Sequence, residues 1–180
     1  MHILITGAGG YIGTTLIPML LEKGHEVRAV DRWWFGRQVV TERHGLEIVD
    51  CDARDLSAEH FNGIDAVIDL VAISNDPAGE MFRAETWEIN RRARARCASL
   101  AKRAGASRYI LPSSCAIYGY RTDAADEWST PNPLTTYSKA NLAAERDVLR
   151  LADDRFCVTV LRQATAYGVS PRMRFDLSLN

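Results

Sequence analysis

The N-terminal segment constrains the fold more than any other part of the chain. A short apolar run at residues 2–6 leads into the glycine-rich stretch 7–13, an amphipathic pattern at about 11–22 and a second apolar run at 26–30. A short apolar run followed by glycines and helical periodicity is typical of a strand, a tight turn and a helix. Asp31 directly follows the second run. We therefore expect a βαβ unit whose two strands are parallel.

Glycines and a carboxylate give this unit its predicted ligand. We expect Gly7 to make the tight turn, Gly10 to let backbone N–H groups approach a pyrophosphate, and Gly13 to let the helix pack closely on the strand. The positive end of the helix dipole then faces the phosphates. The Asp31 carboxylate is placed to accept hydrogen bonds from adenosine ribose hydroxyls and repels a 2′-phosphate. The predicted cofactor is therefore NAD.

Further apolar runs alternate with helical patterns along the rest of the chain. Strands are expected at 2–6, 26–30, 47–50, 65–71, 108–112 and 156–162. Helices are expected at 11–22, 84–104 and 135–152, and loops at 32–45 and 119–133. Such alternation predicts an α/β fold, a doubly wound parallel Rossmann-type sheet with helices on both faces. The arginines of the 84–104 stretch are expected on its solvated side.

Composition limits the partners. With 180 residues and 47% hydrophobic content, the chain can bury one substantial core, and its net charge of −1 gives no reason to expect nucleic acid or a membrane surface as partner. No apolar run approaches the roughly 20 residues of a membrane span, and the N-terminus leads directly into a strand. We therefore expect a cytoplasmic protein. The four cysteines lack the spacing of a metal site, so no metal is predicted.

The next pattern follows the fifth apolar run. The stretch 113–119 reads Ser-Ser-Cys-Ala-Ile-Tyr-Gly, and Tyr137 opens the last helical stretch. In a doubly wound sheet, residues just after the strands meet the ligand. These motifs and their order resemble the extended short-chain dehydrogenase/reductase superfamily. Within it, the chain resembles the NAD-dependent nucleotide-sugar epimerases and dehydratases, of the UDP-glucose 4-epimerase kind, over essentially its whole length.

The resemblance implies a set of binding residues. Those implied for NAD are Gly7, Gly10, Tyr11, Ile12, Gly13, Asp31, Arg32, Asp52, Ala53, Leu70, Val71, Ala72, Asn90 and Gln163. Those implied for a nucleotide-sugar substrate are Ser74, Asn75, Thr165 and Asn180. For the loop at 74–77, a turn closed by Asx hydrogen bonding is the alternative to a substrate contact.

The resemblance also implies catalytic roles, with Tyr137 as the acid/base of a hydride transfer and Ser114 orienting the reacting hydroxyl. A free tyrosine side chain has a pKa of about 10, so a tyrosine base at neutral pH requires a nearby cation. The family has a lysine four residues after the tyrosine, one helical turn away. This chain has Asn141 there, which we expect to be an atypical ribose contact. The family's usual histidine is likewise replaced, by Asp69.

Domain organisation and function therefore leave alternatives. We expect residues 1–168 to form the NAD-binding domain and 169–180 to begin a truncated substrate-binding region, in either a fragment or a natural chain without a substrate lid. One function is a nucleotide-sugar epimerase or dehydratase that transfers hydride. The other is a non-redox descendant that keeps NAD as a structural or regulatory ligand, and does proton-transfer chemistry or only binds a partner. A homodimer is expected through the helices at 84–104 and 135–152, although their apolar sides equally suit covering the sheet.

Overall fold

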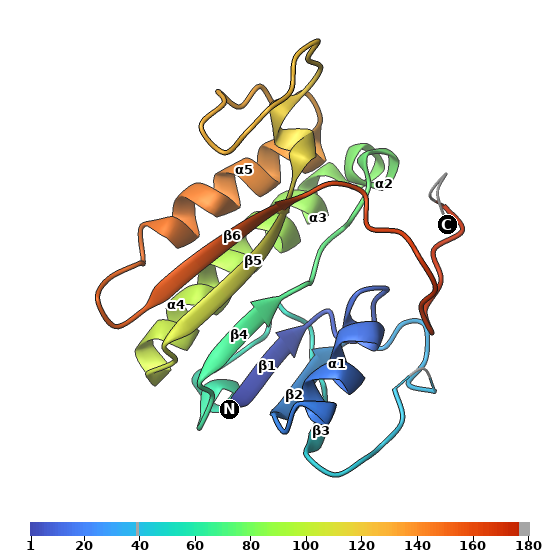
Figure 1. The fold of residues 1–180 in the computed structure, drawn as a ribbon, viewed down its shortest axis with the longest axis vertical. Coiled ribbons are helices and arrows are strands. Elements are labelled where there is room, and N and C mark those ends of the chain that lie inside the picture. Colours follow the sequence, from blue (N-terminus) through green and yellow to red (C-terminus); the bar gives the residue numbers. More distant parts are fainter. Residues whose placement is uncertain (39, 177–180) are drawn as a thin grey trace.

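The computed structural model describes residues 1–38 and 40–176 and contains one parallel sheet (Figure 1). The order of its six strands is β3-β2-β1-β4-β5-β6, which changes direction between β1 and β4. The strands are β1 (His2–Thr6), β2 (Glu26–Asp31), β3 (Leu46–Asp50), β4 (Ala66–Asp69), β5 (Arg108–Ser114) and β6 (Cys157–Gln163). All six predicted strands are present, and the doubly wound fold is confirmed.

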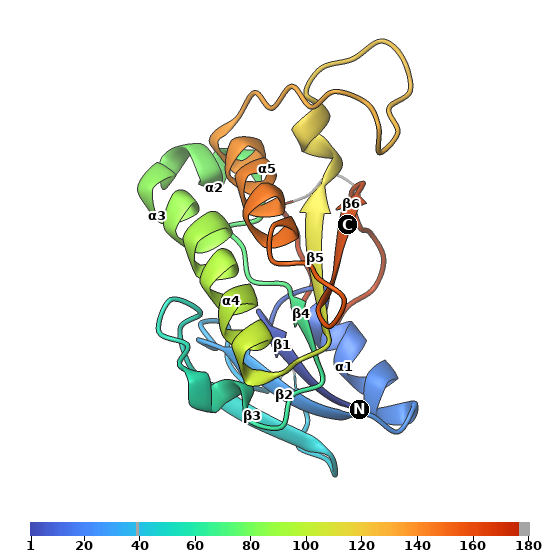
Figure 2. The same cartoon turned by 90° about the vertical axis from the view of Figure 1, so that its left-hand side faces the viewer.

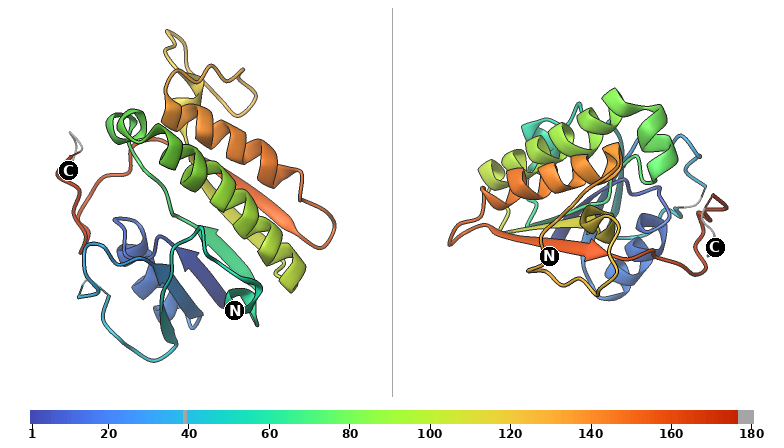
Figure 3. Two further views of the ribbon diagram at one scale, coloured as in Figure 1. Left: turned by 180° about the vertical axis from the view of Figure 1, so that it is seen from behind. Right: turned by 90° about the horizontal axis from the view of Figure 1, so that it is seen from above.

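Helices cover both faces of the sheet, as predicted. Helix α1 (Gly13–Glu22) lies on one face, and α4 (Arg94–Ala104) and α5 (Thr136–Leu149) lie side by side on the other (Figures 2 and 3). Helices α1 and α5 run back from the carboxyl edge of the sheet, so their N-termini begin at that edge. Among the described residues, no helix has the length and apolar character to cross a membrane.

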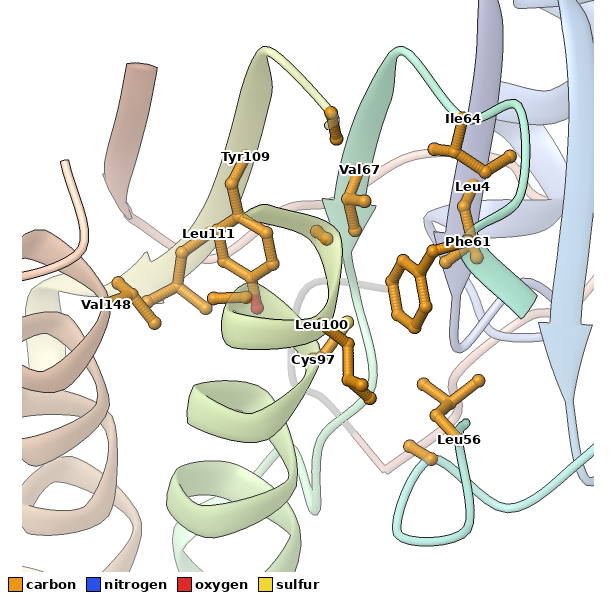
Figure 4. Close-up of a cluster of buried hydrophobic side chains, with 14 of the residues drawn as sticks. Leu4, Leu56, Phe61, Ile64, Val67, Cys97, Leu100, Tyr109, Leu111 and Val148 are labelled. Carbon is orange, nitrogen blue, oxygen red and sulfur yellow. The ribbon is translucent and has the colours of Figure 1, made fainter. Parts of the chain in front are cut away.

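Alternation along the strands divides the core into two layers. Leu4 points toward the α4 and α5 side, while Ile3 and Ile5 pack on the α1 side, because successive strand side chains point to opposite faces. The larger layer joins strand residues such as Tyr109 to helix residues such as Val148 (Figure 4). Burial on both faces explains why these strands read as continuous apolar runs.

The segment between β4 and β5 contains the helix predicted at 84–104, with a short helix before it and a change of hydrogen-bonding pattern within it that we did not predict. It contains α2 (Asp76–Met81), α3 (Arg83–Trp87), a π-helical segment (Glu88–Ala93) and α4. The Asn75 side chain accepts a hydrogen bond of 2.8 Å from the Ala78 N–H and caps α2. A helix of six residues shows too little apolar periodicity to be recognised in a sequence.

Candidate dinucleotide and catalytic site

The carboxyl edge of the sheet brings together the residues that the sequence singled out. They come from the ends of all six strands: the 7–13 turn after β1, Asp31 at the end of β2, Asp52 and Ala53 after β3, Leu70, Val71 and Ala72 after β4, Ser114 at the end of β5, and Gln163 at the end of β6. Tyr137 lies in the first turn of α5, at the same edge. Their positions agree with a ligand site outside the carboxyl ends of parallel strands.

The glycine turn forms the base of this edge. Gly7 has a φ of +63°, and a Cβ there would lie 2.8 Å from the Val71 nitrogen. A Cβ on Gly13 would lie 2.4 Å from the Ala8 oxygen, so the helix approaches the turn more closely than a side chain permits. Within residues 1–38 and 40–176, no side chain caps the N-terminus of α1, which begins after Ile12. An uncapped helix N-terminus next to a glycine-rich turn fits a pyrophosphate.

Asp31 is tied to this turn by backbone hydrogen bonds. Its carboxylate accepts from the Gly9 N–H at 3.0 Å and from the Trp33 N–H at 2.8 Å. The buried Trp33 ring packs against Gly9, where a Cβ would lie 3.0 Å from the ring. Gly9 therefore has a packing role that sequence reasoning missed. The only signal was a glycine at a position that the general fingerprint leaves open.

Arginines surround the carboxylate at the end of β3. Asp52 accepts from Arg32 at 2.9 Å and from Arg54 at 2.7 Å. The hydrogen bonds from Arg54, helped by the charge of Arg32, lower the pKa of Asp52 to about 2. The Arg32 guanidinium also lies over the Trp34 ring, 4.4 Å from its centroid. Asp52 is thus an anion at neutral pH that holds the loop after β2 against the loop after β3.

Asn90 holds the backbone of the loop after β4. Its Oδ1 accepts from the Ile73 N–H at 2.8 Å, and its Nδ2 donates to the Ile73 carbonyl at 2.9 Å. The Thr6 hydroxyl accepts from the Val71 N–H at 3.2 Å. The structure therefore places Asn90 behind the predicted cofactor-binding loop. Direct contact between Asn90 and NAD stays a prediction.

The segment after β6 returns across the carboxyl edge to the glycine turn. The Tyr11 hydroxyl donates to the Gly168 carbonyl at 2.6 Å, and the Ser170 hydroxyl donates to the Tyr11 carbonyl at 2.8 Å. In Figure 1 this segment runs from the end of β6 past the N-terminus of α1. Thr165 is exposed at its beginning.

The same segment then meets the loop after β4. Arg174 donates to the Ser74 hydroxyl at 2.7 Å, and the Asn75 amide donates to the Asp176 carboxylate at 2.8 Å. Arg174 also lowers the pKa of Asp176 to about 2 through hydrogen bonds and charge. Two of the residues predicted for the substrate therefore contact residues 174–176. Asn180 lies outside the described residues.

Ser114 and Tyr137 lie where β5 ends and α5 begins. Ser114 Oγ accepts from the Ala116 N–H at 3.1 Å, which leaves its hydroxyl proton to donate elsewhere. Tyr137 is half-buried and follows Thr135, which caps α5 by accepting from the Ser138 N–H at 3.1 Å. A Cβ on Gly79 would lie 3.0 Å from the Tyr137 Cβ, so α2 packs directly on the first turn of α5.

Asn141 lies one turn beyond Tyr137 and is 1% exposed. Its Oδ1 accepts from Arg94 Nη1 at 2.8 Å, and its Nδ2 donates to the Tyr137 carbonyl at 3.1 Å. The predicted ribose contact of Asn141 stays a prediction. Arg94 itself is 2% exposed, so its assignment to a solvated face was wrong. Its spacing from Asn90 and Cys97 places it on the buried side of the helix, and only its residue type indicated exposure to solvent.

The strand order and the glycine turn at the carboxyl edge define the class of protein, a Rossmann-type α/β domain. Residues 3–179 match the model of the NAD dependent epimerase/dehydratase family. The chain belongs to this family.

Curated relatives cover different activities. A 3 beta-hydroxysteroid dehydrogenase/Delta 5-->4-isomerase of Mycobacterium tuberculosis is 28% identical over 160 residues, which are 82% of this chain and 42% of the relative. UDP-glucuronic acid decarboxylase 1 of Danio rerio is 30% identical over 137 residues, covering 74% of this chain and 32% of the relative. The chain thus spans less than half the length of these relatives.

Solved structures agree with the fold. MoeE5 in complex with UDP-glucuronic acid and NAD is 29% identical, with a TM-score of 0.82, over 90% of this chain and 54% of that chain. UDP-glucuronic acid 4-epimerase from Bacillus cereus in complex with NAD gives a TM-score of 0.87 at 24% identity, over 99% of this chain and 61% of that chain. The second likeness concerns the fold alone.

Proposed function

We propose that this chain is the NAD-binding part of an NAD-dependent enzyme that transfers hydride to and from a nucleotide sugar. The observation that carries the proposal is the convergence, at one sheet edge, of an uncapped helix N-terminus, Asp31, Ser114 and Tyr137. Membership of an NAD-dependent family supports the same reading. The likeness to the MoeE5 structure, which contains NAD, also supports it.

The residues present fit the cofactor. The 7–13 turn and the first turn of α1 would hold the pyrophosphate through backbone N–H groups, because within the described residues no side chain caps that end of the helix. Asp31, already oriented by two backbone N–H groups, would accept from the adenosine ribose. Arg32 and Asp52 would border the adenosine. When bound, NAD supplies the hydride acceptor.

Two side chains would do the proton chemistry. Tyr137 would take the proton of the substrate hydroxyl and return it in the reverse direction. Ser114, whose hydroxyl proton is not used by the Ala116 N–H contact, would donate to the reacting oxygen and orient it. Asn141 would add no charge of its own.

A nucleotide sugar is the proposed substrate class. Its support is the curated relative named for UDP-glucuronic acid and the structure that contains it, together with the polar loop at Ser74 and Asn75. Residues 169–180 would begin the substrate-binding region of a longer architecture. Contacts from Arg174 and Asp176 to the loop after β4 support this, because they bring the segment to the proposed substrate side.

Assembly and compartment belong to the same proposal. We propose a homodimer through α4 and α5, which lie side by side as one layer on the same face of the sheet (Figure 2). Light scattering after gel filtration tests this, and a monomer at every concentration would reject it. We also propose a cytoplasmic protein, in agreement with four free cysteines.

Purified protein with NAD and a panel of UDP-sugars deuterated at the reacting carbon tests the function. We expect reduced-nicotinamide absorbance or a product that carries deuterium, and loss of both in Tyr137→Phe. Tyr120→Phe is the matched control, because that tyrosine is exposed in the loop after Gly119. Tight NAD binding with no deuterium movement for any substrate would reject hydride transfer and favour the non-redox alternative.

A further inference from the structure

Arg94 is a buried cation without a carboxylate partner among the described residues. It is the first residue of α4 and is 2% exposed. Its Nε donates to the Val71 carbonyl and its Nη1 to Asn141 Oδ1, both at 2.8 Å. Burying a guanidinium against neutral acceptors is costly, so an arginine there requires a specific reason.

The buried carboxylate of Asp69 is engaged by other groups. Asp69 accepts from the hydroxyls of Thr6 and Tyr109. Burial, reinforced by the charge of Asp69, raises the pKa of Tyr109 well above its usual range, so this phenol stays a neutral donor. The Tyr109 hydroxyl also lies 3.1 Å from the Arg94 carbonyl. This arrangement anchors the backbone of Arg94 and leaves its guanidinium directed to Val71 and Asn141.

The two acceptors of Arg94 belong to different walls of the site. Val71 lies in the loop after β4, which also holds the predicted NAD contacts Leu70 and Ala72. Asn141 lies in α5 and links Arg94 to the first turn of that helix, because its amide nitrogen donates to the Tyr137 carbonyl at 3.1 Å. The planar guanidinium of Arg94, together with Asn141, therefore joins the loop after β4 to the turn of α5 that carries Tyr137.

We propose that Arg94 is a positioning residue, which sets the first turn of α5, and with it Tyr137, at a fixed place relative to the loop after β4. The inference rests on the proposed function, in which these two walls hold the proton-transfer group and the cofactor. It also accounts for the neutral residue at position 141. A buried guanidinium already occupies the space beside it, and the amide of Asn141 satisfies that guanidinium at one end and the helix backbone at the other.

The first test replaces Arg94 in the NAD-loaded protein. Arg94→Met is expected to lower kcat by about tenfold or more, because small misplacements of reacting groups are costly, while KM for the nucleotide sugar changes less than about threefold. Arg94→Lys keeps the charge and N–H donors but lacks the planar fork that reaches both acceptors, so it is expected to recover only part of the loss. Amide hydrogen exchange of residues 136–141 should become faster in Arg94→Met, in free and NAD-bound protein alike.

Arg91→Met is the matched control. Arg91 donates to Asp147 at 2.8 Å, and so joins the same helical segment to α5 at a point further from Tyr137. It is expected to leave kcat and exchange of residues 136–141 unchanged. Equal effects of Arg91→Met and Arg94→Met on exchange and kcat would overturn the proposal, because they would show a general loosening of the helix pair.

A second pair of variants covers the case in which Arg94→Met does not fold. Asn141→Lys would place two cations at hydrogen-bond distance in a buried site, so we expect a lower Tm and weaker NAD binding. Arg94→Thr combined with Asn141→Lys is expected to recover both. A single Asn141→Lys as stable as the wild type, or effects that simply add in the double variant, would reject the proposal.

These readouts separate the two hypotheses. The Tm, NAD affinity and amide exchange require no hydride transfer. If the wild-type protein never moves hydride but the effects of the Arg94 and Asn141 substitutions are coupled, the proposed function is rejected and the role of Arg94 is retained. If the wild-type protein transfers hydride but the effects of the two substitutions simply add, the role of Arg94 is rejected and the proposed function is retained.

Discussion

At the residue scale, Asp31 has a structural task in addition to its predicted ligand contact. Its carboxylate accepts two backbone N–H groups, from Gly9 in the glycine turn and from Trp33 in the next loop. The sequence predicted the carboxylate at the end of β2 because its place in the βαβ unit is fixed. It did not predict the contact with Trp33, because the conformation of a loop with a residue at φ +53° depends on tertiary packing.

Replacing Asp31 should reduce cofactor affinity. Asp31→Ala is expected to weaken NAD binding at least about tenfold, because it removes the ribose acceptor and leaves the N–H groups of Gly9 and Trp33 without their acceptor. Titration calorimetry measures the change. Asp31→Asn keeps one acceptor oxygen, so its affinity for NAD should lie between those of the wild type and Asp31→Ala. Unchanged affinity in Asp31→Ala would exclude the ribose contact.

At the element scale, the strands and the 84–104 helix were predictable, whereas α2 and the π turn between β4 and β5 were not. Strands buried on both faces give unbroken apolar runs, and the turn after β1 follows a known glycine spacing. The 84–104 stretch has the composition of one helix, but the structure changes its hydrogen-bonding pattern at Glu88–Ala93. Asn90 in that segment and Arg94 directly after it hydrogen-bond to the backbone of Ile73 and Val71, which lie outside the helix and leave no trace in its periodicity.

The contact between α1 and the glycine turn can be tested with one methyl group. Gly13→Ala would place a Cβ 2.4 Å from the Ala8 oxygen, so α1 must move outward. We expect a loss of about 1–3 kcal/mol in the free energy of unfolding, although alanine favours helices, and weaker NAD binding. Urea unfolding measures the first quantity. Thr15→Ala, at an exposed position of the same helix, should cost little. A stabilised Gly13→Ala would contradict the close approach.

At the scale of the whole molecule, the two faces of the sheet are covered unequally. The α4 and α5 layer spans β4, β5 and β6, while α1 covers the other face only near β1 and β2 (Figure 3). On β6, Leu161 is exposed on the face away from α5. The candidate site follows the same division, because cofactor residues cluster beside α1 and the proton-transfer residues beside α5.

Acid stability should depend on the arginine-bound carboxylates. The pKa of Asp52 is lowered to about 2, chiefly by Arg54, so its contribution is complete above about pH 4 and disappears as the pH falls toward 2. Asp52→Asn should therefore make the free energy of unfolding depend less on pH between about pH 4 and pH 2. Above pH 5 its pH dependence should run parallel to that of the wild type. Circular dichroism during acid titration measures this. Asp154→Asn, at an exposed position in a turn, serves as control, and an unaltered slope in Asp52→Asn would refute the assignment.

The π-helical segment also matters for how relatives of this chain are compared. A π turn accommodates one residue more than an α-helical turn, and here it lies just before Arg94 and contains Asn90. A relative with one residue fewer in this region could continue as an ordinary helix while its side chains on one side rotate by about 100°. Its residue aligned with Arg94 would then face a different neighbour. Gaps placed between positions 88 and 94 therefore decide whether equivalent residues are matched at all.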